Sequence, residues 1–254
     1  MSKTINISSL SVGYENKTIL KNINLVSSSN KMIGLFGRNG QGKTTLLKTM
    51  SGLLPPISGN FFYDDIDILG LSEKERAKWL SIISTTQIDI GNIIVKDFIA
   101  FGRFPYTNWL GINKDKDYQE INKAIELCKL NHLANRNYNE LSDGEKQKVN
   151  IARAIAQNTP LIILDEPTVH LDLINKAEVF KLLKDLVKNH DKTIIISTHQ
   201  IEYAMQVCDE IWLINNAKIE AVSSEKMIKT DKLTDLFNDD IISFDKSSQS
   251  FRLK

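Results

Sequence analysis

The sequence predicts an α/β fold with a mainly parallel core sheet, an N-terminal antiparallel β region and a helical lobe. Two observations predict the parallel sheet. First, the glycine-rich stretch GRNGQGKTT (37–45) joins MIGLF, an apolar run typical of a buried strand, to the helical pattern TTLLKTM. Second, the apolar runs LIIL and TIII are each followed by polar residues. Continuous apolar runs are typical of central parallel strands, and ligands gather at the carboxyl ends of such strands.

The chain is long enough to bury a sizeable core. It has 254 residues, of which 42% are hydrophobic. We expect one domain over 1–254, with a helical lobe at about 92–155 and a short C-terminal extension at about 226–254. The 32 Lys and Arg residues nearly balance the 31 Asp and Glu residues, which argues against a broad basic surface for nucleic acid.

Cysteine usage and hydropathy predict a cytoplasmic chain. Cys128 and Cys208 stand alone without metal-ligand spacing, so we expect two small core residues in a reducing compartment. No apolar run approaches the ~18 residues needed to cross a bilayer, and the start MSKTINISSL lacks the apolar core of a signal peptide. Any membrane role would have to come through a partner.

The glycine-rich stretch matches G-x-x-x-x-G-K-[ST], with Gly37 and Gly42 as the fixed glycines, Lys43 as the cation and Thr44 as the hydroxyl. Gly40 adds a third permissive position. Glycines let such a loop turn its backbone N–H groups inward around phosphate oxygens, and the N-terminus of the following helix adds partial positive charge. The alternative is a glycine-rich turn without function, which the flanking strand and helix disfavour.

The residues before the loop indicate short strands, INISSLSVGY, ILKNINLVSS and KMIGLFG. Tyr14 follows a glycine there and could stack on a nucleotide base, although a lone tyrosine is more often an ordinary strand-end residue. After the first helix, a Pro/Gly turn precedes a strand. Ser72 and Glu75 then form a capping box at the start of a short helix. Gln87 ends the next apolar strand and on its own carries almost no signal.

An aromatic segment follows at 92–112. Val95, Phe98 and Ile99, with Phe101, have the spacing of a helix core face, whereas the stretch from Phe101 to Leu110 is rich in turn residues and aromatics. Because one small helical lobe cannot easily hide all of this aromatic area, we expect part of it to be exposed and to bind a partner. The alternative is that Phe101 and Phe104 pack internally and only Tyr106 or Trp109 is exposed.

The stretch LSDGEKQKVNIARAIAQ predicts a helix with Ser142 at its N-cap and Glu145 three residues on. Gly144 is unfavourable in a first helical turn, so a close backbone approach is what it could provide there. Taken alone, the same pattern also suits a well-capped surface helix.

The next segment, PLIILDEPTVHLD, ends its apolar run in two carboxylates. Asp165 is suited to hold Mg²⁺ together with the hydroxyl of Thr44, and Glu166 can take a proton from water. An acidic pair without function is the alternative. His199 ends the later strand in KTIIISTHQ and is, on its own, equally suited to catalysis or to a structural role. Beyond it we expect a helix, a hairpin near Asn215, one further short helix and a strand pair.

With these pieces in order, the chain resembles the ATP-binding subunit of an ABC transporter from about residue 4 to about residue 225. LSDGE discriminates this family from other phosphate-loop NTPases, because the family has LSGGQ-like residues about twenty positions before an LDE strand. The resemblance implies ATP and Mg²⁺ as cofactors, Glu166, His199, Gln87 and Lys43 in catalysis, and Thr44, Gln87 and Asp165 at the metal. It implies nucleotide contacts for Tyr14, Gly37, Asn39, Gly40, Gly42, Lys43, Thr44, Thr45, Ser142, Gly144 and, in the D-loop, Asp172.

Two residues of the signature depart from the family pattern, Asp143 in place of Gly and Glu145 in place of Gln. Ser142 and Gly144 are kept, so we expect activity to survive. The stretch AFGRFPYTNWLG is similar to importers of iron-siderophore, haem and cobalamin chelates, although other importers share every core motif.

The resemblance also implies partners. We expect a homodimer of ATPase subunits, permease subunits docked near Phe101–Leu110 and, indirectly, a solute-binding protein, all at the cytoplasmic face of the inner membrane. The alternatives are another importer or an exporter cassette, and a soluble ABC ATPase acting on nucleic acid or ribosomes. Proteins of that last class usually carry coiled-coil insertions or a second cassette, and neither is visible in this sequence.

Overall fold

The computed structural model describes residues 4–15, 17–84, 91–108, 111–169, 171–230, 232–233, 242–245, 248 and 250–253. Its central sheet has six described strands in the order β10-β9-β3-β8-β7-β6. Adjacent strands are parallel except for β9 and β10, which are antiparallel. The strands are β3 (Met32–Phe36), β6 (Leu80–Ile83), β7 (Leu161–Asp165), β8 (Thr193–Ser197), β9 (Glu210–Asn215) and β10 (Lys218–Ser223). The predicted mainly parallel sheet is therefore confirmed.

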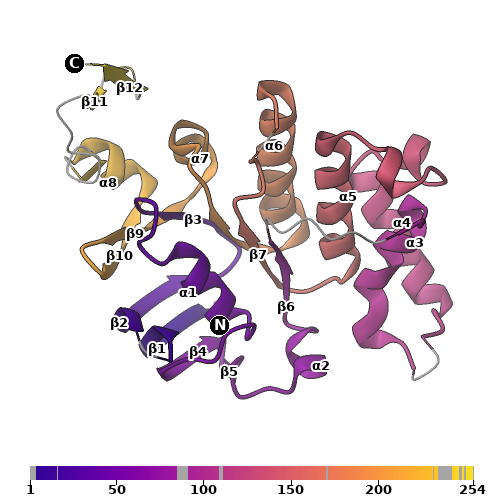
Figure 1. The fold of residues 1–254 in the computed structure, drawn as a ribbon, viewed down its shortest axis with the longest axis horizontal. Coiled ribbons are helices and arrows are strands. Elements are labelled where there is room, and N and C mark those ends of the chain that lie inside the picture. Colours follow the sequence, from indigo (N-terminus) through magenta and orange to yellow (C-terminus); the bar gives the residue numbers. More distant parts are fainter. Residues whose placement is uncertain are drawn as a thin grey trace.

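A second, antiparallel sheet lies at the lower left of Figure 1, beside the central sheet. Its described strands have the order β2-β1-β4-β5, which confirms the predicted N-terminal antiparallel region. They are β1 (Thr4–Tyr14), β2 (Lys17–Ser28), β4 (Ser58–Tyr63) and β5 (Ile66–Asp67). A small antiparallel pair near the C-terminus consists of β11 (Ile242–Asp245) and β12 (Ser250–Leu253).

Most helices lie on the other side of the central sheet or at its right-hand end, whereas α1 (Lys43–Met50) lies on the side of the antiparallel sheet (Figure 1). The α-helices are α1 (Lys43–Met50), α2 (Glu73–Arg76), α3 (Val95–Ala100), α4 (Asp115–Leu127), α5 (Asp143–Ala156), α6 (Leu173–His190), α7 (Ile201–Val207) and α8 (Ser224–Lys229). The described part of the chain also contains the 3₁₀ turns η1 (Phe101–Tyr106), η2 (Asn131–Leu133) and η3 (Tyr138–Glu140). Among the described residues, none of these helices is long and apolar enough to cross a bilayer.

Both faces of the central sheet are covered, because successive side chains of a strand point to opposite faces. In β7, Ile162 and Leu164 belong to the core shared with α3–α7, whereas Leu161 and Ile163 belong to the core shared with α1 and the antiparallel sheet. This double coverage accounts for the continuous apolar run that the sequence shows.

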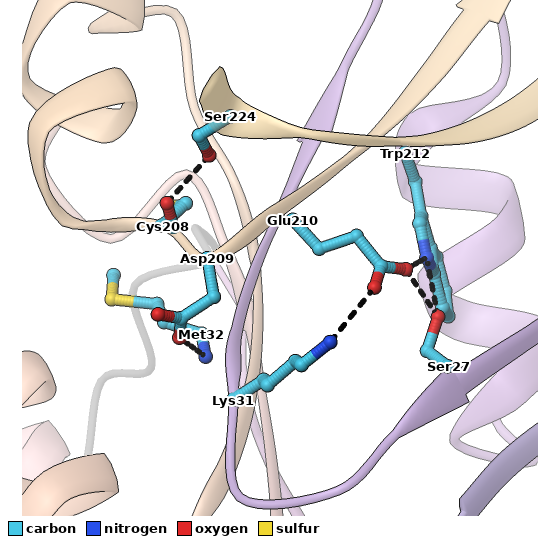
Figure 2. Close-up of polar contacts among 8 residues, drawn as sticks. All are labelled: Ser27, Lys31, Met32, Cys208, Asp209, Glu210, Trp212 and Ser224. Carbon is cyan, nitrogen blue, oxygen red and sulfur yellow. Dashed lines mark hydrogen bonds and ion pairs between the residues drawn. The ribbon is translucent and has the colours of Figure 1, made fainter. Parts of the chain in front are cut away.

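A partly buried polar cluster fastens the antiparallel sheet to the central sheet at the amino ends of β3 and β9 (Figure 2). The Glu210 carboxylate accepts hydrogen bonds from the Ser27 hydroxyl and from Trp212 Nε1, the latter at 3.0 Å, and it pairs with Lys31 at 3.5 Å. Close by, the Met32 amide donates to Asp209 Oδ2 at 2.9 Å. These contacts hold the end of the sheet opposite the glycine-rich loop.

The two cysteines are free and buried, as predicted. Cys128 packs in the helical core, and Cys208 lies beside β3 and β9. Burial raises the pKa of the Cys128 thiol to about 12 and raises the pKa of the Cys208 thiol further above its ordinary value.

Candidate functional site

The glycine-rich loop lies between β3 and α1 and is curled around the ammonium group of Lys43. Lys43 Nζ donates to the carbonyl oxygens of Gly37 at 2.8 Å and of Arg38 at 3.2 Å. Gly42 has a φ of 99°, and a Cβ at this position would lie 2.5 Å from Ile19 Cγ2. Both the left-handed backbone and the lack of space beside Ile19 therefore exclude a side chain at position 42. The required strand, loop and helix context of the motif is present.

Lys43 is buried and lies within the electrostatic reach of two carboxylates. Burial lowers the pKa of its ammonium, and the charges of Glu166 and Asp165 partly oppose that effect. The structure therefore brings Lys43 close to a carboxylate pair that lies more than 120 positions further along the sequence. A cation and two carboxylates at one sheet edge suit a ligand that carries phosphates and a divalent cation.

Glu166 follows β7 in a left-handed conformation, with φ of 49°, which is uncommon for a residue with a side chain. Its backbone N–H donates to Ser197 Oγ at 3.0 Å and to the Ser197 carbonyl at 3.1 Å. Its Oε1 lies 2.6 Å from His199 Nε2. The turn thus directs the Glu166 side chain to His199, the histidine that the sequence analysis singled out.

Ser197 is a site residue that sequence reasoning missed. It is fully buried at the end of β8, and its hydroxyl donates to Asp165 Oδ1 at 2.6 Å. Asp165 and Ser197 are neighbours in the parallel register of β7 and β8. A serine before THQ carries no motif of its own, so only the strand pairing reveals the contact.

The other predicted nucleotide contacts on this side differ in exposure. Thr44 and Asn39 are exposed beside the loop, whereas Thr45 is buried in α1. Tyr14 ends β1 with 52% of its surface exposed, so its ring is free to receive a base. The first turn of α1 contains no acidic residue, which leaves its N-terminal N–H groups available to an anion.

The predicted signature residues lie at the N-terminus of α5, away from the loop: Figure 1 shows α5 on the right of the molecule and α1, which follows the loop, at the lower left. The capping box is present: the Ser142 amide and hydroxyl both donate to Glu145 Oε2 at 2.8 Å. These bonds, that of the amide first, lower the pKa of the Glu145 carboxyl. One chain therefore carries the loop and the signature at two different places.

Gly144 makes the close approach that the sequence suggests. A Cβ on Gly144 would lie 2.9 Å from the side chain of Asn175. Asn175 is held in turn by Asp172, whose carboxylate caps α6 by accepting from the Asn175 backbone N–H at 2.8 Å and from its side-chain amide at 3.0 Å. The predicted D-loop residue thus lies beside the signature of the same chain.

The aromatic segment differs in part from the expectation. Phe101 and Phe104 are 53% and 72% exposed, so the alternative in which both pack internally is wrong. Tyr106 is half-buried, because the Arg103 guanidinium covers its ring at 4.0 Å from the centroid. Trp109 and Leu110, like Gln87, lie outside the described residues.

Arg103 fixes this segment to the rest of the lobe. It is almost fully buried, with Nε 2.9 Å from Asp117 Oδ1 and Nη1 donating to the Ala156 carbonyl at 2.7 Å. Asp117 also accepts from the Lys114 amide at 2.9 Å. The exposed phenylalanines are therefore carried on a 3₁₀ turn that is bonded to both α4 and the end of α5.

The donor set suits Mg²⁺ bound together with a phosphate ligand. Asp165 and Thr44 offer a carboxylate and a hydroxyl, which are oxygen ligands of the kind that Mg²⁺ prefers. Among the described residues, no group of three or more His, Cys, Asp or Glu side chains is arranged to hold a metal. A magnesium ion here would therefore complete its ligands with phosphate oxygens and water, as is usual for this ion.

Comparison with known proteins gives a consistent result. The family model described as ABC transporter matches residues 20–169. The chain is 36% identical to the petrobactin import ATP-binding protein YclP of Bacillus subtilis, over 92% of each protein. It is 35% identical to the iron(3+)-hydroxamate import ATP-binding protein FhuC of the same organism, over 77% of this chain and 72% of FhuC.

Among solved structures, the chain is similar to an inward-facing transporter assigned to the metal-chelate type of ABC transporter. The TM-score is 0.81 at 28% identity, and the alignment covers 98% of this chain and 95% of the other.

Proposed function

The chain belongs to the ABC transporter family, and from this premise we propose that it is the ATP-hydrolysing subunit of an importer for an iron chelate. The observation that carries the proposal is the single site formed by Lys43 within its loop and by Asp165 and Glu166 at the end of β7, which β8 separates from β3 in the sheet. Such a site has the groups needed to bind a nucleoside triphosphate and to hydrolyse it.

The names of relatives and the sequence of one segment support the proposed substrate. Relatives such as YclP and FhuC are named for petrobactin and iron(3+)-hydroxamate import. The stretch AFGRFPYTNWLG also resembles the class that imports iron-siderophore, haem or cobalamin chelates. Iron chelates are the members of that class that the names of the relatives support.

Each site residue has a proposed role in hydrolysis. Lys43 and the loop amides bind the phosphates, Thr44 and Asp165 hold Mg²⁺, and Tyr14 stacks on the base. Bound Mg²⁺ would neutralise charge on the phosphates. Glu166 takes a proton from the attacking water, and His199 contacts the γ-phosphate while it holds Glu166 in place. Gln87 would complete the metal site.

Two copies are proposed to complete each nucleotide site. Cassettes of this family form dimers and work with membrane permease subunits in importers. Because the loop and the signature of one chain lie apart, Ser142 and Gly144 of one copy would face the nucleotide held by Lys43 of the other. Leu173 and Ile174, which are 67% and 72% exposed beside Asp172, would be covered in such a dimer.

The permease is proposed to dock on Phe101 and Phe104. These are large exposed aromatic side chains on a turn that buried hydrogen bonds fix to α5, and aromatic anchors on rigid elements dominate interface energies. The whole chain would act as one ATPase domain, with residues 92–155 as the lobe that meets the permease at the cytoplasmic face of the membrane. A solute-binding protein would act through the permease.

Uptake of a radiolabelled ferric siderophore by cells tests this function. Cells that lack the gene should lose uptake, and the wild-type gene should restore it, whereas the Phe101→Ser/Phe104→Ser variant should not. In pull-downs, that variant should also fail to retain the permease while it keeps its intrinsic ATPase activity. Tyr118→Ser is the matched control, since Tyr118 is 55% exposed on α4. Normal ferric-siderophore uptake without the gene would refute the proposed substrate class.

A further inference from the structure

Ser197 lies beside the acidic pair of the proposed ATPase site, and its inferred role rests on that proposed function. Ser197 is fully buried at the carboxyl end of β8. It lies directly beside Asp165, its neighbour in the parallel register. A hydroxyl without exposed surface has no access to a nucleotide, so any effect of Ser197 on catalysis must pass through the residues that it contacts.

The hydrogen bonds of this hydroxyl fix its orientation. A serine hydroxyl has one proton to donate, and its oxygen can also accept. The proton is directed to Asp165 Oδ1 at 2.6 Å, a length typical of a hydroxyl bound to a charged carboxylate. The oxygen accepts the backbone N–H of Glu166 at 3.0 Å. One side chain thus bonds to both residues of the acidic pair.

These contacts leave one oxygen of the Asp165 carboxylate available to bind a cation. Within the described part of the chain, the structure records a hydrogen bond to Oδ1 of Asp165 and none to Oδ2. The carboxylate is itself buried, with 4% of the residue exposed, so its rotation is set by a single strong donor. Groups that bond to a metal ligand in this way typically change metal affinity or activity by about 10–100-fold when they are removed.

We propose that Ser197 is a positioning residue for Mg²⁺-dependent ATP hydrolysis. Its hydroxyl fixes the rotation of the Asp165 carboxylate, so that Oδ2 remains the oxygen offered to Mg²⁺. By accepting the Glu166 N–H, it also supports the left-handed backbone that directs the Glu166 side chain to His199. The competing explanation is that Ser197 only fills space and satisfies a hydrogen bond within the sheet.

The dependence of nucleotide affinity on Mg²⁺ separates these explanations. The dissociation constant of a fluorescent ADP analogue would be measured for the purified full chain in excess Mg²⁺ and in EDTA. For Ser197→Ala, we expect affinity in Mg²⁺ to fall by about 10–100-fold and affinity in EDTA to stay at the wild-type value. Lys43 and the loop amides, which bind phosphates without the metal, are unchanged in this variant.

Ser81→Ala is the matched control. Ser81 is also fully buried, on β6 next to β7, but its hydroxyl accepts from Thr159 Oγ1 at 3.2 Å and contacts neither carboxylate. The Ser81→Ala protein should lose some stability, because a buried hydrogen bond is removed, and it should keep the wild-type response to Mg²⁺. Equal loss of the Mg²⁺ response in both variants would contradict a specific role for Ser197.

Two further variants sharpen the test, and the first of them keeps it decisive if Ser197→Ala folds poorly. Ser197→Cys has nearly the same size and only a weak S–H donor, so it should fold and lose part of the Mg²⁺ response. Adding Ser197→Ala to Asp165→Asn should cause no further loss, since Ser197 acts through Asp165. A full Mg²⁺ response in Ser197→Cys, or additive losses in the double variant, would overturn the inference. If the wild-type protein itself binds nucleotide without regard to Mg²⁺, the proposed function fails instead.

Discussion

At the scale of single residues, the backbone of Glu166 determines where its carboxylate lies. A left-handed conformation costs a residue with a side chain of order 1–3 kcal/mol, and Glu166 adopts one directly after β7. Two hydrogen bonds from its N–H to Ser197 and the contact with His199 offset that cost. Strain of this kind is most often found at functional sites.

Glu166→Gln should bind ATP and hydrolyse it very slowly. Glutamine keeps the size of the side chain but cannot take a proton from water, and general bases contribute about 10²–10⁴-fold to rate. Phosphate release measures the ATPase rate, and the elution volume with and without ATP measures the dimer that accumulates. Turnover at the wild-type rate would show that Glu166 is not the base.

The loss of activity in Tyr14→Ala should depend on the base of the nucleotide, whereas the loss in Lys43→Ala should not. Loss of the Lys43 ammonium should lower turnover of every triphosphate, by about 10²–10³-fold. Loss of the Tyr14 ring should mainly raise KM for ATP, by roughly 5–150-fold for a stacking interaction of about 1–3 kcal/mol. Inorganic triphosphate is the control substrate. Equal losses for it and for ATP in Tyr14→Ala would contradict stacking.

At the scale of elements, the turn η1 is joined to α4 and α5 through a buried ion pair. The pKa of Asp117 is subject to burial, which raises it, and to the Lys114 amide and Arg103, which together lower it below its usual value. A carboxyl whose pKa is lowered by folding stabilises the protein above its unfolded pKa, near 4, and loses that contribution as the pH falls through the folded pKa.

Asp117→Ala should therefore destabilise the lobe at neutral pH by about 3–5 kcal/mol, because it leaves Arg103 buried without its partner. It should also flatten the fall in stability at acidic pH, because the wild-type protein loses the Asp117 contribution as the pH falls from about 4 through the lower folded pKa. Urea unfolding at pH 7 and at several acidic pH values measures both effects. Asp115→Ala is the control, since Asp115 is exposed on the first turn of the same helix. A parallel acid limb in wild type and Asp117→Ala would contradict this assignment.

The sequence was sufficient for features that depend on near neighbours. The strand, loop and helix around Lys43 and the capping boxes at Ser72 and Ser142 follow from local patterns, and all are present. The burial of β7 and β8 also follows from uninterrupted apolar runs. These features need no knowledge of the tertiary structure.

Features that depend on distant neighbours were not predictable. Ser197 matters only because β8 lies beside β7 in a register that pairs it with Asp165. Tyr106 belongs to the segment that was expected to be partly exposed, yet Arg103 covers its ring and is held there by Asp117, fourteen positions on. Local sequence reports that aromatic residues are present, but not which of them a buried charge will cover.

At the scale of the whole molecule, the proposed dimer makes a prediction about exposed aliphatic residues. Ile174→Lys should prevent the ATP-dependent dimer of the Glu166→Gln protein, because an ammonium group would have to lose its water in place of an apolar contact. Size-exclusion chromatography with ATP measures this. Val26→Lys is the control, since Val26 is 69% exposed on β2 of the antiparallel sheet. A dimer unaffected by Ile174→Lys would contradict this interface.

Both cysteines of the chain are buried, with thiol pKa values raised far above neutrality. Because the thiolate is the reactive form, the native fold shields Cys128 and Cys208 from maleimide dyes and spin labels. A single cysteine introduced at an exposed position outside the proposed interfaces, such as Val26 or Tyr118, would then carry the label by itself. The wild-type chain is therefore already a suitable background for fluorescence and spin-label distance measurements on the assembled transporter, without removal of its own cysteines.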